Sequence, residues 1–370
     1  MANWHLATYQ DNLFKNNLGI INLDNTLEKY VYKLQDPIDD SITSVNENNW
    51  LRIDITHADK TVSDWVTTNS TWTEDTNITG LVNGSVYWVY GAPYSYYTII
   101  ADGKSYGLQS VSNTDGKITG KDINDSDVSI DIKTITKVII GDLVTEIGYS
   151  AFAGCSSLTS VTIPDSVETI GVGAFAICSK LASVTIGDSV TTIPQGAFSE
   201  CSSLVSLTIP DSVTEIGFGA FFLCSSLVSL IIPASVTEIG QLAFYKCYSL
   251  ASLTFEENSE LQTIGESAFS RCFSLASVTI PDSVTSIRDD AFELCIKLAS
   301  LTFEENSKLD TIGESAFSGI NSSNSPTEAI ITIPQTVLTN LNTKYDTTLS
   351  HNTGQSFFGA SVTLQDPASS

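Results

Sequence analysis

Residues 150–320 of this chain repeat every 23 or 25 positions, and this repeat limits the possible fold more than any other feature. The dipeptide Ala-Phe recurs with spacings of 23, 23, 23, 23, 25, 23 and 25 residues, ending at Phe152, Phe175, Phe198, Phe221, Phe244, Phe269, Phe292 and Phe317. A cysteine follows three residues after each of the first seven phenylalanines, and a leucine three residues after each cysteine. One such unit cannot bury its own apolar edge, so stacked units must bury it against each other, which predicts a solenoid.

Each unit is expected to hold a short strand such as Ser-Val-Thr-Ile, a turn, a second extended piece and a bend. Neighbouring coils should then lie one strand spacing apart, about 4.8 Å. A first, incomplete copy begins near Ile135. Glycine follows the isoleucine that ends the second extended piece in most coils, but Pro194 and Arg288 take the same position. Because proline fixes φ at a negative value, the position does not require a left-handed backbone, and glycine is there either for space or as a habit of the repeat.

The seven cysteines stand in register, one for each of the first seven coils, which predicts a buried column of free thiols. Free cysteine packs as a small apolar residue, and Ile320 takes its place in the eighth copy. Disulfides between adjacent coils are the alternative. They require paired geometry, and the number of cysteines is odd.

Composition divides the chain, because all five tryptophans precede residue 90 and all seven cysteines follow residue 150. We therefore predict three parts: a β-rich N-terminal capping or docking domain over 1–134, a repeat solenoid of about 8 units over 135–334, and a C-terminal cap or tail over 335–370. Alternating aromatic and polar residues and the turns Asp102-Gly103 and Asp115-Gly116 favour antiparallel hairpins in the first part. The segment NTLEKYVYKLQ is compatible with either a helical turn or a strand.

Charge and composition exclude several classes of function. The net charge of −25 repels phosphates, so we expect no nucleic acid partner. No run of 18 apolar residues is present and no secretory signal is visible at the start, so we expect no membrane insertion. The three histidines lie outside the repeats and the cysteines have no C-x-x-C spacing. We therefore expect no enzyme activity, no cofactor and no metal site.

The unit C-x-x-L-x-S-L-T-I-P-x-S-V-T-x-I-G-x-x-A-F, repeated over residues 135–334, resembles the BspA-like branch of the leucine-rich repeat family. The resemblance implies an α/β-type repeat solenoid that is right-handed and carries its short strands in one parallel sheet on the concave side. It also implies a recognition role, because members of this branch are commonly surface proteins that bind host or microbial partners.

Departures from the repeat mark a candidate ligand-binding surface, because the solenoid does not require them. Large apolar side chains replace small or polar ones on adjacent coils, and exposed aromatic patches are typical of interfaces. These residues are Phe218, Phe222, Leu223, Tyr245, Tyr248, Phe273 and Ile296. The alternative is that these side chains fold back over the bends of the coils.

Two further surface patterns are ambiguous. Serine and threonine recur at outward strand positions, broken by Ile231, as expected for solubility, for a hydrogen-bonding face toward glycan or protein, or for an ice-binding lattice. The two 25-residue copies insert the acidic segments FEENSELQTIG and FEENSKLDTIG. Solvated charge is the simpler explanation for these segments, and calcium binding is the alternative.

These features together predict a non-enzymatic recognition or adhesion protein that presents its repeat surface to a protein or a cell-surface glycan. The alternative is a structural virion component, such as a phage fibre or decoration protein, docked into a larger viral or surface assembly through residues 1–134. Either function predicts an extracellular-facing location, on a cell surface or a virion.

Overall fold

The computed structural model describes residues 131–141, 144–322, 328–352 and 354–367 in full, and only the backbone of the strands within residues 3–118. The chain divides into two compact units. The first comprises Met1–Thr98, Gly107–Thr114 and Gly141–Leu143, and the second, called the solenoid below, comprises Ile99–Tyr106, Asp115–Ile140 and Val144–Ser370. The domain boundary that we place at residue 134 rests on where the repeat begins in the sequence. It stays a prediction.

The first unit is built around a six-stranded sheet with the order β1-β2-β3-β6-β4-β5. Its pairings are antiparallel throughout, as expected for a β-rich region. The strands are β1 (Asn3–Gln10), β2 (Leu13–Asn16), β3 (Gly19–Leu23), β4 (Val31–Leu34), β5 (Trp72–Glu74) and β6 (Val86–Ser95). The NTLEKYVYKLQ segment therefore contains a strand, and the two Asp-Gly turns lie outside the described residues.

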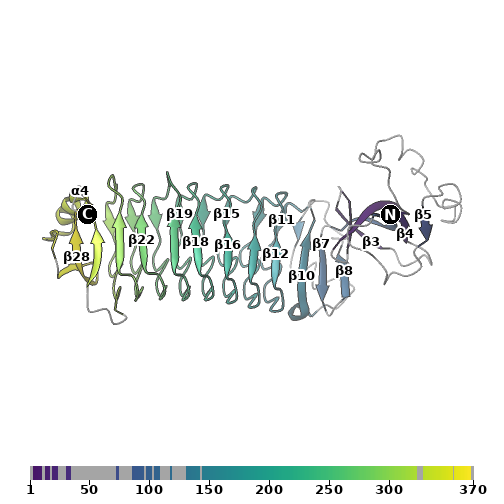
Figure 1. Cartoon of the computed structure of the whole chain (residues 1–370), viewed down its shortest axis with the longest axis horizontal. Coiled ribbons are helices and arrows are strands. Elements are labelled where there is room, and N and C mark those ends of the chain that lie inside the picture. The colour runs from purple at the N-terminus through teal and green to yellow at the C-terminus, as the bar shows by residue number, and fades with distance from the viewer. Residues whose placement is uncertain are drawn as a thin grey trace. The chain divides into compact units, whose positions relative to one another are not determined.

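The solenoid carries two columns of parallel strands, one from each of two sides of the coil (Figure 1). The longer strands are β12 (Ser160–Thr162), β14 (Ser183–Thr185), β16 (Ser206–Thr208), β18 (Ser229–Ile232), β20 (Ser252–Phe255), β22 (Ser277–Ile280) and β24 (Ser300–Phe303). The two-residue strands are β9 (Lys117–Ile118), β11 (Glu146–Ile147), β13 (Thr169–Ile170), β15 (Thr192–Ile193), β17 (Glu215–Ile216), β19 (Glu238–Ile239), β21 (Thr263–Ile264), β23 (Ser286–Ile287) and β25 (Thr311–Ile312).

Further strands precede the first full coil. Strand β10 (Ile135–Ile140) forms a sheet with β7 (Tyr97–Ala101) and β8 (Lys104–Leu108), and the 3₁₀ helix η3 (Ile132–Thr134) leads into it. The predicted repeat solenoid is confirmed, as a stack of parallel-strand coils with little helix.

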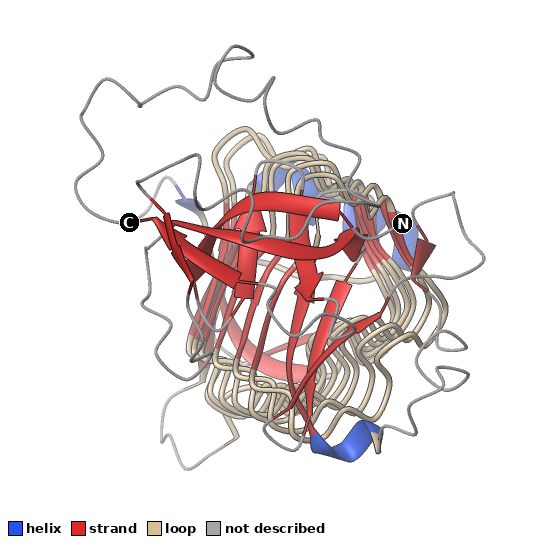
Figure 2. Ribbon diagram, turned by 90° about the vertical axis from the view of Figure 1, so that its right-hand side faces the viewer, coloured by secondary structure: helices blue, strands red, loops and turns tan. Residues whose placement is uncertain are grey.

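The register of the strands explains the columns of the sequence. Ser160 pairs with Ser183 and Ser183 with Ser206, so equivalent residues of successive coils lie side by side. The middle residue of each three-residue strand is buried and its two neighbours are exposed, as the alternation of a strand requires. The hydrogen bonds of both columns therefore run along the stack, from one coil to the next, and successive turns overlie one another (Figure 2).

The third side of each coil is a bend that also bonds to its neighbours. The amide of Phe198 donates to the carbonyl of Ala220, and the amide of Phe221 to that of Ala243, both at 2.8 Å. Two residues with positive φ shape each bend; in the central coil they are Gly219 (φ 55°) and Leu223 (φ 59°). The bends place the repeated phenylalanines inside, in a stack whose ring centroids lie 5.2 to 5.7 Å apart.

The glycine that follows the isoleucine column is needed for space. Gly265 has no positive φ, and a Cβ atom built on it would lie 2.5 Å from the carbonyl carbon of Gly240 in the preceding coil. Contacts this short to backbone do not occur, so successive glycines here let the coils approach each other. The prediction from Pro194 and Arg288, that this position needs no left-handed backbone, is confirmed, and of the two explanations for glycine the close contact favours space.

All seven cysteines are free and buried, as predicted. The structure adds a polar role to their packing. Except for Cys155, each thiol lies within hydrogen-bonding distance of a phenylalanine carbonyl of the preceding coil, at 3.2 to 3.5 Å. Cys224, for example, donates to Phe198. The residue therefore combines small apolar volume with a weak donor for a buried carbonyl.

We expect the thiols to react only when the chain unfolds. In the folded protein a thiol reagent should modify fewer than one cysteine per chain over minutes, because all seven are buried. In denaturant, without reductant, about seven should react. Counting modified thiols by intact-mass spectrometry checks both values, and two or fewer reactive thiols in denaturant would instead indicate disulfides.

The C-terminal segment continues the stack and covers its last coil. Strand β26 (Ala329–Thr332) pairs in parallel with β24 and β28 (Ala360–Gln365), and β27 (Gln355–Phe357) closes the sheet in antiparallel orientation. Helix α4 (Gln335–Tyr345) joins β26 to this hairpin. The ring of Phe357 lies 5.7 Å from that of Phe317, so the last ring of the core stack is also covered.

Candidate ligand-binding surface

The aromatic residues singled out in the sequence form two stacked pairs on the bends of neighbouring coils. The rings of Phe222 and Tyr245 are 5.4 Å apart between centroids, and those of Tyr248 and Phe273 are 5.0 Å apart. All four side chains are half-buried. We call these two pairs the bend stacks. Both interpretations of the sequence stay predictions, since the rings stack on the bends and each remains partly exposed.

The other predicted residues differ in exposure. Phe218 is 44% exposed, on the bend two residues after Ile216. Leu223 and Ile296 are half-buried, and the positive φ of Leu223 belongs to the bend itself. The structure therefore brings the aromatic residues together in pairs, with Phe218 as the most exposed ring of the set.

A second surface, on the longer strands, was only partly visible in the sequence. The serines and threonines at outward strand positions do point away from the core, and Ile231, which replaces a threonine, is 57% exposed. Val205 and Val228 lie side by side at the start of two successive strands and are 49% and 47% exposed. The sequence alone could have identified Val205 and Val228 as departures from the repeat, because the same position holds threonine or alanine in the other coils from Thr159 to Ala299.

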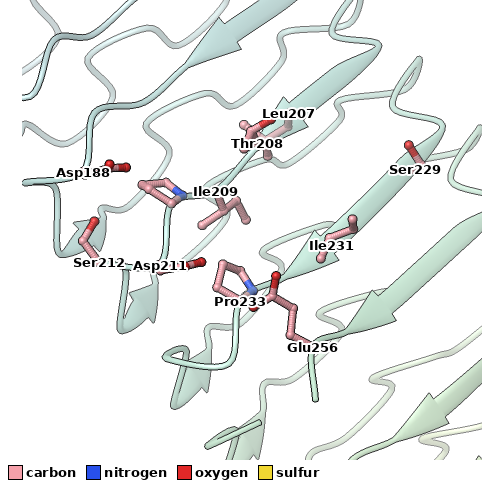
Figure 3. Close-up of a pocket in the computed structure, with 11 residues that line it drawn as sticks. Asp188, Leu207, Thr208, Ile209, Asp211, Ser212, Ser229, Ile231, Pro233 and Glu256 are labelled. Atoms are coloured by element: carbon pink, nitrogen blue, oxygen red, sulfur yellow. The ribbon is translucent and has the colours of Figure 1, made fainter. Parts of the chain in front are cut away.

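A groove of about 540 Å³ runs beside these strands, where they pass into the following turns. It is lined by Asp188, Leu207, Thr208, Ile209, Pro210, Asp211, Ser212, Ser229, Ile231, Pro233 and Glu256. Figure 3 shows Asp188, Asp211 and Glu256 on different turns along one edge, with Thr208 and Ile231 on the strands. We call this feature the strand groove.

One coil of the strand groove carries apolar residues where the preceding coil carries polar ones. Residues 229–235 read S-L-I-I-P-A-S, whereas the preceding coil reads S-L-T-I-P-D-S. Ile231 and Ala234 thus replace a threonine and an aspartate in the same coil. The carboxylate of Glu256, from the next coil, accepts the amide of Ala234 at 3.1 Å. An apolar coil therefore lies between carboxylates on both sides.

The charge around the strand groove has one sign. Residues 181–245 contain five carboxylates and no lysine, arginine or histidine. Within the fully described residues, the ion pairs join Lys344 to Asp310 and His351 to Asp366, and neither involves the groove. Asp188 and Asp211 are exposed, and neither forms an ion pair with a cation in the fully described part of the chain.

The acidic insertions have a structural explanation. Glu304 accepts the amide of Asp282 at 2.9 Å, as Glu256 accepts that of Ala234. The first glutamate of each insertion therefore ties its loop to the preceding coil. Among the residues that the structure describes, no group of three histidine, cysteine, aspartate or glutamate side chains is placed to hold a metal ion.

The buried thiols are poorly suited to nucleophilic chemistry. Burial raises the pKa of Cys247 and that of Cys295 to about 12, from 9.0. A reactive cysteine requires the opposite shift, because the thiolate is the nucleophile.

The described helices include none long and apolar enough to span a bilayer.

Comparison with known proteins agrees with this architecture. Residues 130–251 and 237–361 match the sequence profile described as BspA type Leucine rich repeat region, in 6 copies. No curated protein sequence matches the chain.

Several solved structures are similar over part of their length. A leucine-rich repeat protein from Bacteroides ovatus is 33% identical with a TM-score of 0.45, over 52% of this chain and 53% of that one. A leucine rich cell surface protein from Faecalibacterium prausnitzii is 27% identical with a TM-score of 0.34, over 61% of this chain and 73% of that one. This chain thus spans about half the length of the Bacteroides ovatus protein.

Proposed function

Since this chain belongs to the BspA-type leucine-rich repeat family, we propose that it is a non-enzymatic recognition protein whose solenoid binds a protein partner through the bend stacks. The observation that supports this function most is the placement of four aromatic side chains, which the repeat does not require, on the outer bends of three successive coils. Large aromatic side chains dominate the binding energy of protein interfaces.

The stacking geometry favours a protein over a glycan. A sugar ring packs against an open aromatic face. Phe222 and Tyr245 cover one face of each other, as do Tyr248 and Phe273, and Lys246 Nζ lies 5.1 Å from the centroid of the Tyr245 ring. Half-buried rings beside a cation suit contacts with the mixed apolar and polar side chains of a protein surface.

The test replaces one ring in each pair by the residue found in other coils. We expect Tyr245→Ser with Phe273→Ser to lower the affinity for target cells at least tenfold, or about 1.4 kcal/mol, because each change removes an aromatic anchor. Saturation binding of labelled protein to epithelial and bacterial cells, measured by flow cytometry, gives the affinity. Each change should leave the free energy of unfolding within about 1 kcal/mol, as surface substitutions usually do.

Two controls separate binding from folding and protein from glycan. Thr302→Ser on the opposite strand side should change neither binding nor stability. Protease treatment of the cells should abolish binding, whereas periodate oxidation of their glycans should not. Unchanged affinity of the double variant, or a loss of stability that accounts for lost binding, would show that the rings only cover the bends.

The absence of enzyme activity is part of this proposal and is supported by the raised thiol pKa values and by the family. An extracellular-facing location is also proposed, on the same family grounds. A role as a virion component docked through residues 1–134 stays a prediction from the sequence. Separate expression of residues 1–134 and 135–370 would test it, since only the first piece should bind the parent particle.

A further inference from the structure

The strand groove combines apolar residues with carboxylates on both sides, and among the fully described residues no ion pair joins a cation to these carboxylates. The apolar coil is a local departure, because Ile231 and Ala234 replace the threonine and the aspartate found at these positions in other coils. Ile231 is 57% exposed, which leaves a β-branched apolar side chain of the groove in water. These two changes in one coil are not explained by the packing of the solenoid.

From this arrangement we infer that the strand groove binds an extended, cationic segment of a protein partner, with an apolar side chain against Ile231 and a lysine or arginine on each side. The inference deepens the proposed function, since it names a partner chemistry for the same recognition protein at a different surface.

The spacing of the coils fits such a segment. Asp211 and Glu256 flank the apolar coil from the preceding and following coils, so their backbones lie about 10 Å apart at two strand spacings. In an extended chain, side chains on one face recur about every 6.6 Å, so residues i−2 and i+2 lie about 13 Å apart. Lysine and arginine side chains are long and flexible enough to make up the difference of about 3 Å between these two separations. A pattern of cation, spacer, apolar, spacer, cation therefore matches the groove.

Charge adds both affinity and orientation. No lysine or arginine occurs between Lys180 and Lys246, so the field over these coils is negative throughout. A partly enclosed groove lined by carboxylates attracts cationic segments and repels acidic ones. Glu256 already accepts one backbone amide, and Asp188 and Asp211 are both exposed to solvent.

A synthetic peptide tests the inference directly on the full chain. The probe is the peptide acetyl-Gly-Lys-Thr-Leu-Thr-Lys-Gly-amide, titrated into ²H,¹⁵N-labelled protein while amide shifts are followed by NMR. We expect saturable shifts at Ser229, Leu230 and Ile231, and a dissociation constant that rises at least tenfold between 20 mM and 200 mM salt.

Two groove variants should weaken this binding. Ile231→Thr restores the residue of the other coils, and Asp188→Asn with Asp211→Asn removes two carboxylates without changing size. Each should raise the dissociation constant at least tenfold. The matched control is Asp282→Asn, which removes a carboxylate from the equivalent position of a coil outside the groove and should change the constant less than twofold.

Several outcomes would overturn the inference. These are equal weakening by Asp282→Asn, equal affinity for a peptide with glycine in place of leucine, or shifts that map away from β18. The Tyr245→Ser, Phe273→Ser protein should bind the peptide normally. If that variant binds both the peptide and the cells normally, the proposed role of the bend stacks is refuted and the groove inference stands. If the groove variants bind the peptide as well as the natural protein does, the groove inference is refuted and the proposed role of the bend stacks is unaffected.

Discussion

Raising the pH from 8 to 10 should lower the free energy of unfolding by about 1.4 kcal/mol for each buried thiol whose pKa is raised. Burial raises the pKa of Cys224, Cys247, Cys272 and Cys295, and hydrogen bonds between neighbouring thiols together with burial raise that of Cys155 and Cys178. The sign follows from proton release. Above pH 9 the unfolded chain loses thiol protons that the folded chain keeps, so alkaline solution stabilises the unfolded state. The stability is therefore complete below pH 9 and is lost as the pH rises toward the folded value, about 12 for Cys247.

The six contributions together amount to about 8 kcal/mol at pH 10, if the solenoid unfolds as one unit. Urea unfolding at pH 8, 9 and 10 measures the decline. In Cys247→Ala one titrating thiol is missing, so the gap in stability between this variant and the natural protein should shrink by about 1.4 kcal/mol over this range. Val236→Ala, a buried change without a titrating group, should keep a constant gap. Parallel curves for all three proteins would mean that the thiols do not control alkaline stability.

The substitution Phe221→Ala should cost about 3–5 kcal/mol, because it opens a cavity in the middle of the phenylalanine stack. The ring of Phe221 is fully buried and lies 5.5 Å from that of Phe198 and 5.2 Å from that of Phe244. Its loss removes the apolar contact on both sides, and the rigid register of two strand columns prevents the coil from collapsing into the space.

The neighbouring residue supplies a matched control. Phe222 has the same side chain but lies half-buried on the outer bend, stacked on Tyr245 alone. We expect Phe222→Ala to cost about 1 kcal/mol, as for a partly exposed aromatic pair. Urea melts of both variants at pH 7 give the comparison. Similar losses in the two proteins would show that burial within the coil does not decide stability here.

The sequence was sufficient to predict what the repeat imposes. The 23-residue period gives the stack, and the columns of phenylalanine, cysteine and isoleucine give its core, because identical coils must place identical residues side by side. The exception at Ile320 correctly indicated that the cysteine site is apolar. The glycine column was also interpreted correctly, since proline and arginine at the same position excluded a left-handed backbone there.

Features that depend on the offset between coils were not predictable. The thiol of Cys224 meets the carbonyl of Phe198, 26 residues earlier rather than one period of 23, so counting along the repeat does not reveal this contact. The aromatic residues stand out in the sequence as departures from the repeat, but their arrangement as stacked pairs depends on which bends adjoin. The strand groove was missed because Ala234 is an ordinary apolar residue that becomes informative only beside Ile231.

The direction of the hydrogen bonds between coils has a mechanical consequence. Because these bonds run along the stack, a force that pulls its two ends apart loads the few bonds of one coil interface at a time, rather than shearing many strands together. Coils should then detach singly from an end of the stack. Each detached coil of about 23 residues would release roughly 75–80 Å of extended chain. A protein of this design would lengthen stepwise under tension between two attached bodies, and the remaining coils would stay folded.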